Sequence, residues 1–408
     1  MVNHEGLSPE MIRATLAESL SGRNLKKALI VPPDMTRANS GAGLITRICY
    51  DLLGGADILP ALGTHAPTTR GEQTAFFGGH IPESRYLVHD WRGGVTKIGE
   101  IPGDFVREVS EGLMDKPIGV EISDYLLDSS YSLILSVGQV VPHEVAGMAN
   151  YTKNIAVGCG GADFISSSHM LGAFYGMERI MGRADTPVRR VLDYAQEHML
   201  SGLPVLYIMT VVAQDKIIGL FIGEGREEFA RAAALSREHN INYVSAPLET
   251  CVAWLDGHEF KSAWLANKAI YRARMAMADG GRLIILAPGV SKFGEDSETD
   301  RLIRRYGYSG RENILKLCKT EPELQANLSA AAHLIHGSAD GRFSVTYATR
   351  HLSRAEVEGV GFAYMSFDDA VREYQPESLK EGYNTSPGGP IYYIANPALG
   401  LWALEGAF

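Results

Sequence analysis

The chain has 408 residues, of which 45% are hydrophobic and 21% are charged, a composition typical of globular proteins. This length exceeds what one hydrophobic core usually serves, so we expect two domains. The net charge of -10 argues against nucleic-acid binding, because no basic stripe offsets it. The four cysteines include no CxxC pair, which excludes the usual thiolate zinc site and indicates a reducing compartment.

Neither the N-terminal sequence nor the most apolar region of the chain predicts a membrane segment. The N-terminal sequence predicts an amphipathic helix capped at Ser8 and lacks the apolar core of a signal peptide. The longest apolar region, residues 204–223, is interrupted by Gln214, Asp215 and Lys216. Because a membrane helix needs about 20 apolar residues, this region is predicted to be a β-hairpin. We therefore expect a soluble, cytoplasmic protein that binds neither nucleic acid nor a membrane.

Strands and amphipathic helices alternate through the first half of the chain. We predict strands at 28–33, 56–65 and 131–143, and helices at 43–53 and 226–240. Each predicted strand runs into a polar loop, which is typical of α/β proteins. Ligands of such proteins bind at the carboxyl ends of the strands.

A second unit is predicted to begin after residue 240. A long helix is expected at 260–281, closed by two glycines, and strands are expected at 282–289 and 343–349. The tail from residue 366 begins like a strand, and we expect it to rejoin the first domain.

The predicted fold is therefore α/β with two domains, each a mostly parallel sheet flanked by helices. The larger domain comprises 1–240 and is completed by 366–408, and the smaller α/β domain comprises 241–365. The active site is expected in the cleft between the domains, where closure would exclude water.

Asp34 and Arg37 follow the first predicted strand. A carboxylate accepts hydrogen bonds from hydroxyl groups, and a guanidinium binds carboxylate or phosphate with two donors. The pair could thus hold a hydroxylated anionic ligand. The alternative is a capped helix start with a local ion pair.

Four histidines are candidates for chemistry. His65 and His143 follow predicted strands and could form a pair of acid/base groups, since imidazole titrates near neutral pH. His169 follows three serines that could cap a helix, and it could bind a metal through a neutral imidazole. His89 could be a ligand or base, although a structural role is the simpler interpretation.

Lys153 lies among small and apolar residues and is predicted to enter a strand. An ammonium without a partner is costly to bury, so Lys153 could be a nucleophile or a phosphate partner. Gly158, Gly160 and Gly161 follow it, and their amides could receive a phosphate.

Lys268 and Trp264 lie one turn apart on the predicted helix that opens the second unit. Without further information, Lys268 would be interpreted as a surface lysine.

These motifs, in this order, resemble those of the lactate racemase family, whose members use a nickel-pincer nucleotide. The family's DxTR is found at 34–37, and its GTH is found at 63–65. Its proline-histidine, lysine and second histidine correspond to Pro142-His143, Lys153 and His169, and its second-domain lysine corresponds to Lys268.

The resemblance implies a cofactor, a pyridinium-3,5-bisthiocarboxylic acid mononucleotide that carries nickel. It implies that His169 is the nickel ligand and that Lys153 tethers the cofactor through a thioamide. Asp34 would hold the ribose, and the glycines of the GxGG turn would receive the phosphate. The biosynthetic enzymes that make this nucleotide become implied partners in maturation.

The implied activity is that of an isomerase, a racemase or epimerase of a 2-hydroxy acid. His65 and His143 would lie on opposite sides of the substrate and exchange its hydroxyl proton, while the cofactor takes and returns the α-hydrogen as hydride. Arg37 and Lys268 would bind the substrate carboxylate, and Trp264 would contact the substrate.

Three positions differ from the family's pattern. Ala66 replaces an arginine, residues 149–152 replace a glycine-rich SGG, and Trp264-Leu265 replaces the tyrosine-glutamine pair of lactate-specific members. The amide and hydroxyl groups of 149–152 would suit a sugar acid, whereas Trp264 and Leu265 would suit an aromatic or apolar substrate.

Two other functions stay open at this point. One is a zinc hydrolase or lyase that uses His65, His89 and His143 with Lys153 as an electrophile, although the chain contains no HExxH motif. The other is a non-catalytic protein that binds a sugar acid or nucleotide.

Overall fold

The computed structural model describes residues 1–398 and 400–408 as two compact units. Unit 1 comprises Met1–Tyr175 and Ile180–Asn240, and unit 2 comprises Gly176–Arg179 and Ile241–Phe408. None of the helices in the described part of the chain is long and apolar enough to span a membrane.

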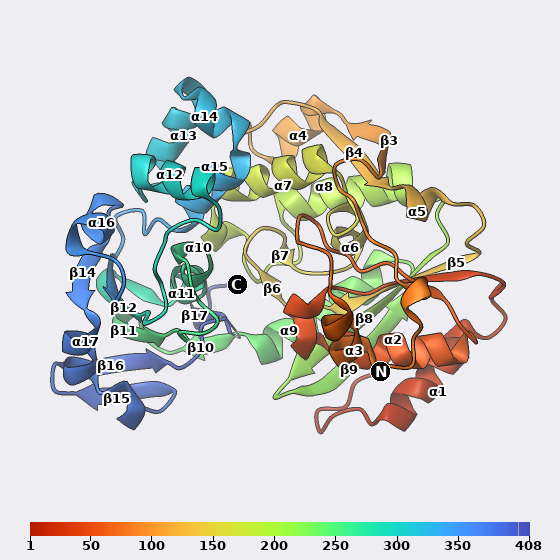
Figure 1. The fold of residues 1–408 in the computed structure, drawn as a ribbon, viewed down its shortest axis with the longest axis horizontal. Coiled ribbons are helices and arrows are strands. Elements are labelled where there is room, and N and C mark those ends of the chain that lie inside the picture. The colour runs from red at the N-terminus through yellow and green to blue at the C-terminus, as the bar shows by residue number, and fades with distance from the viewer. Residues whose placement is uncertain (399) are drawn as a thin grey trace. The chain divides into compact units, whose positions relative to one another are not determined.

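Unit 1 is built on a five-stranded sheet with the order β2-β1-β5-β8-β9. Figure 1 labels strands β5, β8 and β9 of this sheet. Its strands are β1 (Ala28–Val31), β2 (Asp57–Ile58), β5 (Leu133–Gln139), β8 (Val205–Ala213) and β9 (Lys216–Gly223). All neighbouring strands are parallel except β8 and β9, which form the predicted antiparallel hairpin.

Helices cover both faces of this sheet. One core packs the sheet against α1 (Pro9–Leu20), α2 (Ala42–Leu52) and α3 (Arg70–Phe77). The other core packs it against α6 (Thr152–Ala156), α7 (Ala162–Tyr175), α8 (Pro187–Ala195) and α9 (Arg226–Asn240). The predicted cap of α1 is confirmed, since the Ser8 side chain accepts a hydrogen bond from the amide of Met11.

Smaller elements complete unit 1. They are η1 (Met35–Ser40), η2 (Glu83–Arg85), β3 (Val95–Ile101), α4 (Gly103–Val109), β4 (Ile118–Ser123), α5 (Asp124–Leu127), β6 (Pro142–His143), β7 (Gly147–Met148) and η4 (Gln196–Leu200).

Unit 2 is built on a six-stranded sheet with the order β14-β13-β12-β11-β16-β15. Its strands are β11 (Leu248–Trp254), β12 (Met277–Leu286), β13 (Ser344–Thr349), β14 (Ala363–Ser366), β15 (Gly382–Ser386) and β16 (Gly389–Ile394). Only β15 runs antiparallel to its neighbour. The predicted mixed α/β class with mostly parallel sheets is therefore confirmed.

Helices and a separate strand pair surround that sheet. The strand pair is β10 (Asn242–Val244) with β17 (Trp402–Leu404). The helices are η3 (Met177–Arg179), α10 (Ala263–Ala266), α11 (Lys268–Ala273), α12 (Ser297–Tyr306), α13 (Arg311–Thr320), α14 (Pro322–Ala326), α15 (Leu328–His336), α16 (Arg354–Gly359), α17 (Phe367–Tyr374) and η5 (Pro376–Ser378).

The prediction that 366–408 completes the first domain is wrong. Strand β16 from this tail pairs in parallel with β11, and β17 pairs with β10. Ile391 and Tyr393 of β16 are buried in the core of the unit 2 sheet. The tail thus joins the sheet of unit 2 because its apolar side chains are buried there.

The predicted long helix at 260–281 is also wrong. It is broken into α10 and α11, and the chain from Met277 onward is strand β12. Gly280 adopts a φ of 79° beside a shift in the β11–β12 register. These glycines therefore belong to a bulge within a strand, a common place for a left-handed glycine, and do not end a helix.

Candidate functional site

The polar residues of unit 1 gather where strands β1, β2 and β5 end. Asp34 follows β1, His65 lies beyond β2, and His143 lies four residues after the end of β5. Strand β1 lies between β2 and β5, so the connection that follows β1 leads to one side of it and the chain after β2 returns to the other side. Ligand sites of open α/β sheets lie at such switch points, outside the carboxyl ends of the strands.

Asp34 and His65 form a close pair. Nδ1 of His65 lies 2.5 Å from Oδ2 of Asp34, and the backbone amide of Thr36 donates to Oδ1 of Asp34. Burial raises the pKa of the Asp34 carboxyl, but the hydrogen bonds from His65 and Thr36 lower it by more, so its pKa lies below the ordinary value. The Asp34 side chain is 8% exposed and that of His65 is 59% exposed, so a buried carboxylate orients a ring that faces solvent.

His143 is held by the backbone of its own hairpin. Its Nδ1 accepts hydrogen bonds from the amides of Val145, at 3.1 Å, and Ala146, at 3.3 Å. A backbone N–H group can only donate a hydrogen bond, so Nδ1 of His143 carries no proton. The neutral ring therefore carries its proton on Nε2. Burial, and then the charge of Lys153, hold the pKa of His143 well below its ordinary value.

His169 has the opposite tautomer. It lies within α7, and the three serines predicted to cap that helix also lie inside it. Nδ1 of His169 donates to the carbonyl oxygen of Ile165 at 2.6 Å, so Nε2 keeps a lone pair. Burial and the charge of Lys153 lower the pKa of His169 to about 4. The ring is therefore neutral and partly exposed at neutral pH, which is the state of a metal-binding imidazole.

Lys153 lies in helix α6 and not in the predicted strand. Its side chain is partly exposed, and burial of the amine together with the charge of Arg37 lowers its pKa to about 8. The uncharged amine, the form that a nucleophilic lysine requires, is thus more populated near neutral pH than in an ordinary lysine.

Electrostatic interactions connect these groups into one cluster. The charges of Lys153 and Arg37 act on His143, and the charge of Glu144 acts on both histidines and on Lys153. The sequence analysis missed Glu144, although its position next to His143 was a signal that could have identified it.

The glycine turn does not offer the predicted free amides. The amides of Gly158, Gly160 and Gly161 donate to backbone carbonyl oxygens at 3.0, 3.3 and 3.1 Å. A Cβ on Gly158 would lie 2.7 Å from Cβ of Ala61, and one on Gly161 would lie 2.7 Å from Cβ of Glu121. These glycines permit close packing of the backbone around the cluster.

His89 has a structural role in that turn. It is 4% exposed, and its Nε2 donates to the carbonyl oxygen of Gly160 at 3.0 Å. Among residues 1–398 and 400–408, no three histidine, cysteine or carboxylate side chains are grouped so that they could hold a metal ion. The structure therefore does not assemble His65, His89 and His143 into the zinc site considered above.

The predicted substrate residues of unit 2 lie on adjacent short helices. Trp264 in α10 stacks on His333, with ring centroids 4.1 Å apart, and is partly exposed. Lys268 begins α11, is partly exposed, and places Nζ 5.9 Å from the centre of the Phe260 ring.

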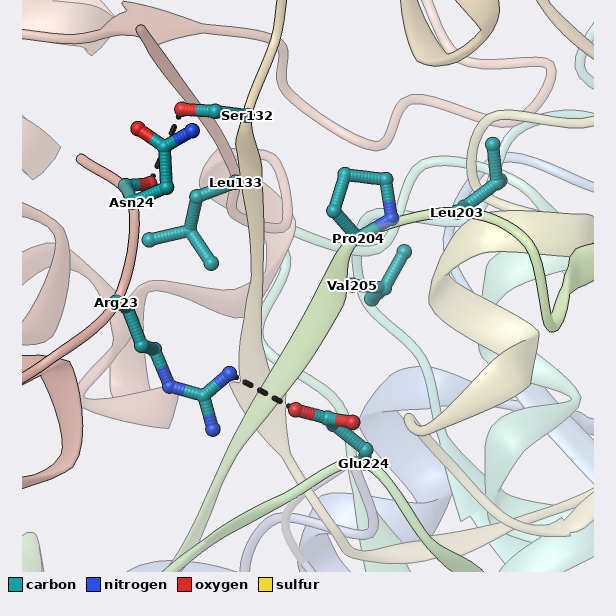
Figure 2. Close-up of a pocket in the computed structure, with 8 residues that line it drawn as sticks. All are labelled: Arg23, Asn24, Ser132, Leu133, Leu203, Pro204, Val205 and Glu224. Atoms are coloured by element: carbon teal, nitrogen blue, oxygen red, sulfur yellow. Dashed lines mark hydrogen bonds and ion pairs between the residues drawn. The ribbon is translucent and has the colours of Figure 1, made fainter. Parts of the chain in front are cut away.

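A pocket elsewhere in unit 1 does not contain these groups. Figure 2 shows it lined by Leu133 and Val205, where β5 and β8 begin, and crossed by the ion pair between Arg23 and Glu224 at 2.8 Å. It lies at the amino-terminal edge of the parallel strands, whereas Asp34 and His143 follow their carboxyl ends. We therefore do not assign the candidate site to it.

Comparison with known families identifies the region that carries the cluster. Residues 7–180 match the family model described as the lactate racemase N-terminal domain. This part of the chain is thus similar to the lactate racemase N-terminal domain. The matched range includes all the site residues predicted in unit 1, from Asp34 to His169, so the lactate racemase resemblance inferred from their motifs is confirmed.

Solved structures extend the lactate racemase likeness to the fold of nearly the whole chain. A structural genomics target from Thermotoga maritima has a TM-score of 0.82 at 24% identity, with 99% of this chain and 100% of that chain covered. The lactate racemase apoprotein from Thermoanaerobacterium thermosaccharolyticum has a TM-score of 0.72 at 19% identity, with 97% and 93% covered. No curated protein matches the chain.

Proposed function

We propose that the chain is a racemase or epimerase of a 2-hydroxy acid and works with a nickel-pincer nucleotide. The observation that carries this proposal is the combination, in a lactate racemase N-terminal domain, of His169, with a free Nε2 lone pair, and Lys153, with a partly uncharged amine. A metal ligand and an amine nucleophile whose charge acts on that ligand fit a cofactor that is both coordinated and tethered.

The residues of unit 1 fit such a group. Nε2 of His169 would bind the nickel, and the amine of Lys153 would form the covalent link. Asp34 accepts hydrogen bonds from His65 and Thr36, and its carboxylate has remaining acceptor capacity for a ribose hydroxyl. When bound, the cofactor would supply a reversible acceptor for the α-hydrogen of the substrate, removed as hydride.

The two catalytic histidines are proposed to have unequal roles. His65 directs Nδ1 to the Asp34 carboxylate, so its Nε2 can take the hydroxyl proton of the substrate while Asp34 stabilises the imidazolium. His143 presents an Nε2–H to the substrate oxygen, because its Nδ1 is occupied by two amides. Proton exchange at His143 would require those bonds to open, so we assign the first proton transfer to His65.

Two cationic side chains are proposed to bind the substrate carboxylate. Arg37 is exposed and acts electrostatically on both Lys153 and His143. Lys268 of unit 2, with Trp264 one turn before it, is the proposed second contact.

The test is mass spectrometry of the protein co-produced with the nickel-pincer biosynthetic enzymes. We expect a nickel-containing nucleotide adduct that survives denaturation in the wild type and in a Lys97→Ala control, but not in Lys153→Ala. If the adduct is seen only under native conditions, the cofactor assignment stands and the covalent link to Lys153 is rejected. No adduct, with zinc bound in its place, would overturn the proposal.

A further inference from the structure

Two residues with left-handed backbone conformations precede the helix that carries Lys153. Asn150 has a φ of 70°, and Tyr151 has a φ of 58° with a ψ of -137°. Glycine normally occupies the latter region, as in type II′ turns, and another residue held there costs on the order of 1–3 kcal/mol. Lys153 follows Tyr151 by two residues, so this strained turn sets where the Lys153 amine lies.

Packing holds the Tyr151 side chain in this conformation. The residue is 3% exposed, and its ring centroid lies 4.5 Å from that of Tyr207 and 5.5 Å from that of Phe229, on which it stacks. The guanidinium of Arg189 lies 4.3 Å from the centre of the same Phe229 ring. Thus Tyr151 and Arg189 share one aromatic partner.

Arg189 also bonds to the backbone of the turn. The residue is 0% exposed, and its Nη2 donates to the carbonyl oxygens of Met148, at 2.8 Å, and Asn150, at 3.3 Å. Its Nε and Nη1 atoms have no hydrogen-bond partner among the described residues. Burial lowers the pKa of Arg189 to about 10, and the nearby Asp193 carboxylate opposes this change.

Stability alone does not account for this arrangement. A buried charge with unsatisfied donors usually costs several kcal/mol, and the Asp193 carboxylate is itself bonded to Arg226 at 2.6 Å. The hydrogen bonds that Arg189 does make end on two carbonyls of the strained turn. Strain that the surroundings maintain in this way is characteristic of functional sites.

The other side of Lys153 is fixed as well. Nδ2 of Asn154 donates to the carbonyl oxygen of Val31, at 3.0 Å, and to Oγ of Ser136, also at 3.0 Å. These acceptors lie in β1 and β5. Lys153 is therefore placed between a residue anchored to the sheet and a turn anchored by Arg189.

We propose that Arg189 is a positioning residue that fixes the Met148–Tyr151 turn, so that Lys153 meets the reactive group of the cofactor in one orientation. This inference rests on the proposed function, in which Lys153 carries the nucleotide. Arg189 touches neither substrate nor cofactor in this role and acts only through the backbone before Lys153.

Hydrogen exchange of the cofactor-free protein tests the positioning without any cofactor chemistry. In Arg189→Met we expect exchange across residues 148–156 to rise about tenfold or more, because the bonds to the turn are lost. The matched control is Arg190→Met, which removes an exposed neighbour paired with Asp185 at 3.0 Å and should exchange like the wild type. Unchanged exchange across 148–156 in Arg189→Met would overturn the proposal.

Cofactor attachment provides a readout that a purely structural role would not move. In protein co-produced with the biosynthetic enzymes, Arg189→Met should lower the covalent fraction of bound nucleotide about tenfold while non-covalent nucleotide remains bound. Arg189→Lys, whose ammonium can reach one carbonyl, should restore part of it. Equal losses of covalent and non-covalent nucleotide, with no rescue by lysine, would overturn the positioning role.

Two outcomes separate this inference from the proposed function. If the wild type carries no adduct, the proposed function fails, and the exchange experiment still decides whether Arg189 holds the turn. If Arg189→Met does not fold, Arg189→Lys replaces it in the exchange experiment, where a smaller rise confined to 148–156 is expected and wild-type exchange would reject the proposal.

Discussion

His169 in unit 1 and His333 in unit 2 are both helical histidines whose pKa is lowered by burial, to about 4 and about 3. Their ring nitrogens differ. His169 donates Nδ1 to a carbonyl and leaves Nε2 free for a ligand. His333 has Nδ1 2.9 Å from the hydroxyl of Tyr271 and Nε2 2.9 Å from that of Tyr308. A depressed histidine pKa therefore does not identify a site, whereas the partner of the second nitrogen does.

The polar surroundings of the two histidines also differ. The cluster in unit 1 combines charged groups, Lys153, Arg37 and Glu144, whose charges act on its histidines. The surroundings of His333 are aromatic rings and the amide of Asn267, at 3.5 Å from Nε2. The arrangement in unit 1 leaves Nε2 of His169 available to a ligand. In unit 2, both ring nitrogens of His333 have hydrogen-bond partners, and the ring stacks on Trp264.

The largest expected effect is a difference in nickel content between variants of the two histidines. His169→Ala should reduce nickel retained by protein co-produced with the biosynthetic enzymes ~100-fold, because it removes the proposed ligand. His333→Ala should keep its nickel and instead lose ~2–4 kcal/mol of stability, because two buried hydroxyls each lose a hydrogen bond to the imidazole. Elemental analysis and urea unfolding measure these changes, and equal nickel contents would refute the assignment of His169.

The next effect tests the pair that orients His65. Asp34→Asn should lower kcat on a 2-hydroxy acid substrate ~100-fold, since an amide neither fixes the tautomer of His65 nor stabilises its protonated form. Nickel content should stay at the wild-type level, because His169 and Lys153 are unchanged and an amide oxygen at this position can still accept a hydrogen bond from the ribose. Wild-type kcat in this variant would show that His65 needs no carboxylate partner.

Acid should destabilise the fold through its buried neutral histidines. The pKa of His333 is lowered from its ordinary value of 6.5 to about 3 in the folded protein. Between these two pH values, His333 is protonated in the unfolded chain but stays neutral in the folded chain. Stability therefore falls as pH decreases through this window, and the His333 contribution lost at pH 5 is ~2 kcal/mol. Urea unfolding at pH 7.5 and 5.0 should show a smaller loss in His333→Gln than in the wild type, and equal losses would contradict this mechanism.

The smallest effect concerns the substrate contact proposed in unit 2. Lys268→Ala should raise KM for the hydroxy acid ~10-fold, because one partner of its carboxylate is lost, and should leave nucleotide retention intact. The control is Lys261→Ala, an exposed lysine seven residues earlier. Loss of the nucleotide in Lys268→Ala would instead assign this lysine to cofactor binding.

The sequence by itself determined the fold class and predicted most residues of the candidate site. Apolar runs that end in polar loops predicted the parallel strands, and the DxTR, GTH and histidine-lysine-histidine motifs indicated the lactate racemase family. These features are local, because strand propensity and motif spacing are encoded within short stretches of chain. The hairpin at 204–223 was predictable for the same reason, since charged and amide residues interrupt its apolar run.

Tertiary structure alone decided how these residues are used. The tail from 366 joined unit 2 because its apolar side chains complete the β11–β16 sheet, a long-range pairing that local sequence does not encode. The amides of the glycine turn donate hydrogen bonds to backbone carbonyl oxygens, and hydrogen bonds with the backbone set the tautomers of His143 and His169. Hydrogen-bond partners depend on which segments meet in space, so the chemical state of each site residue followed from the fold.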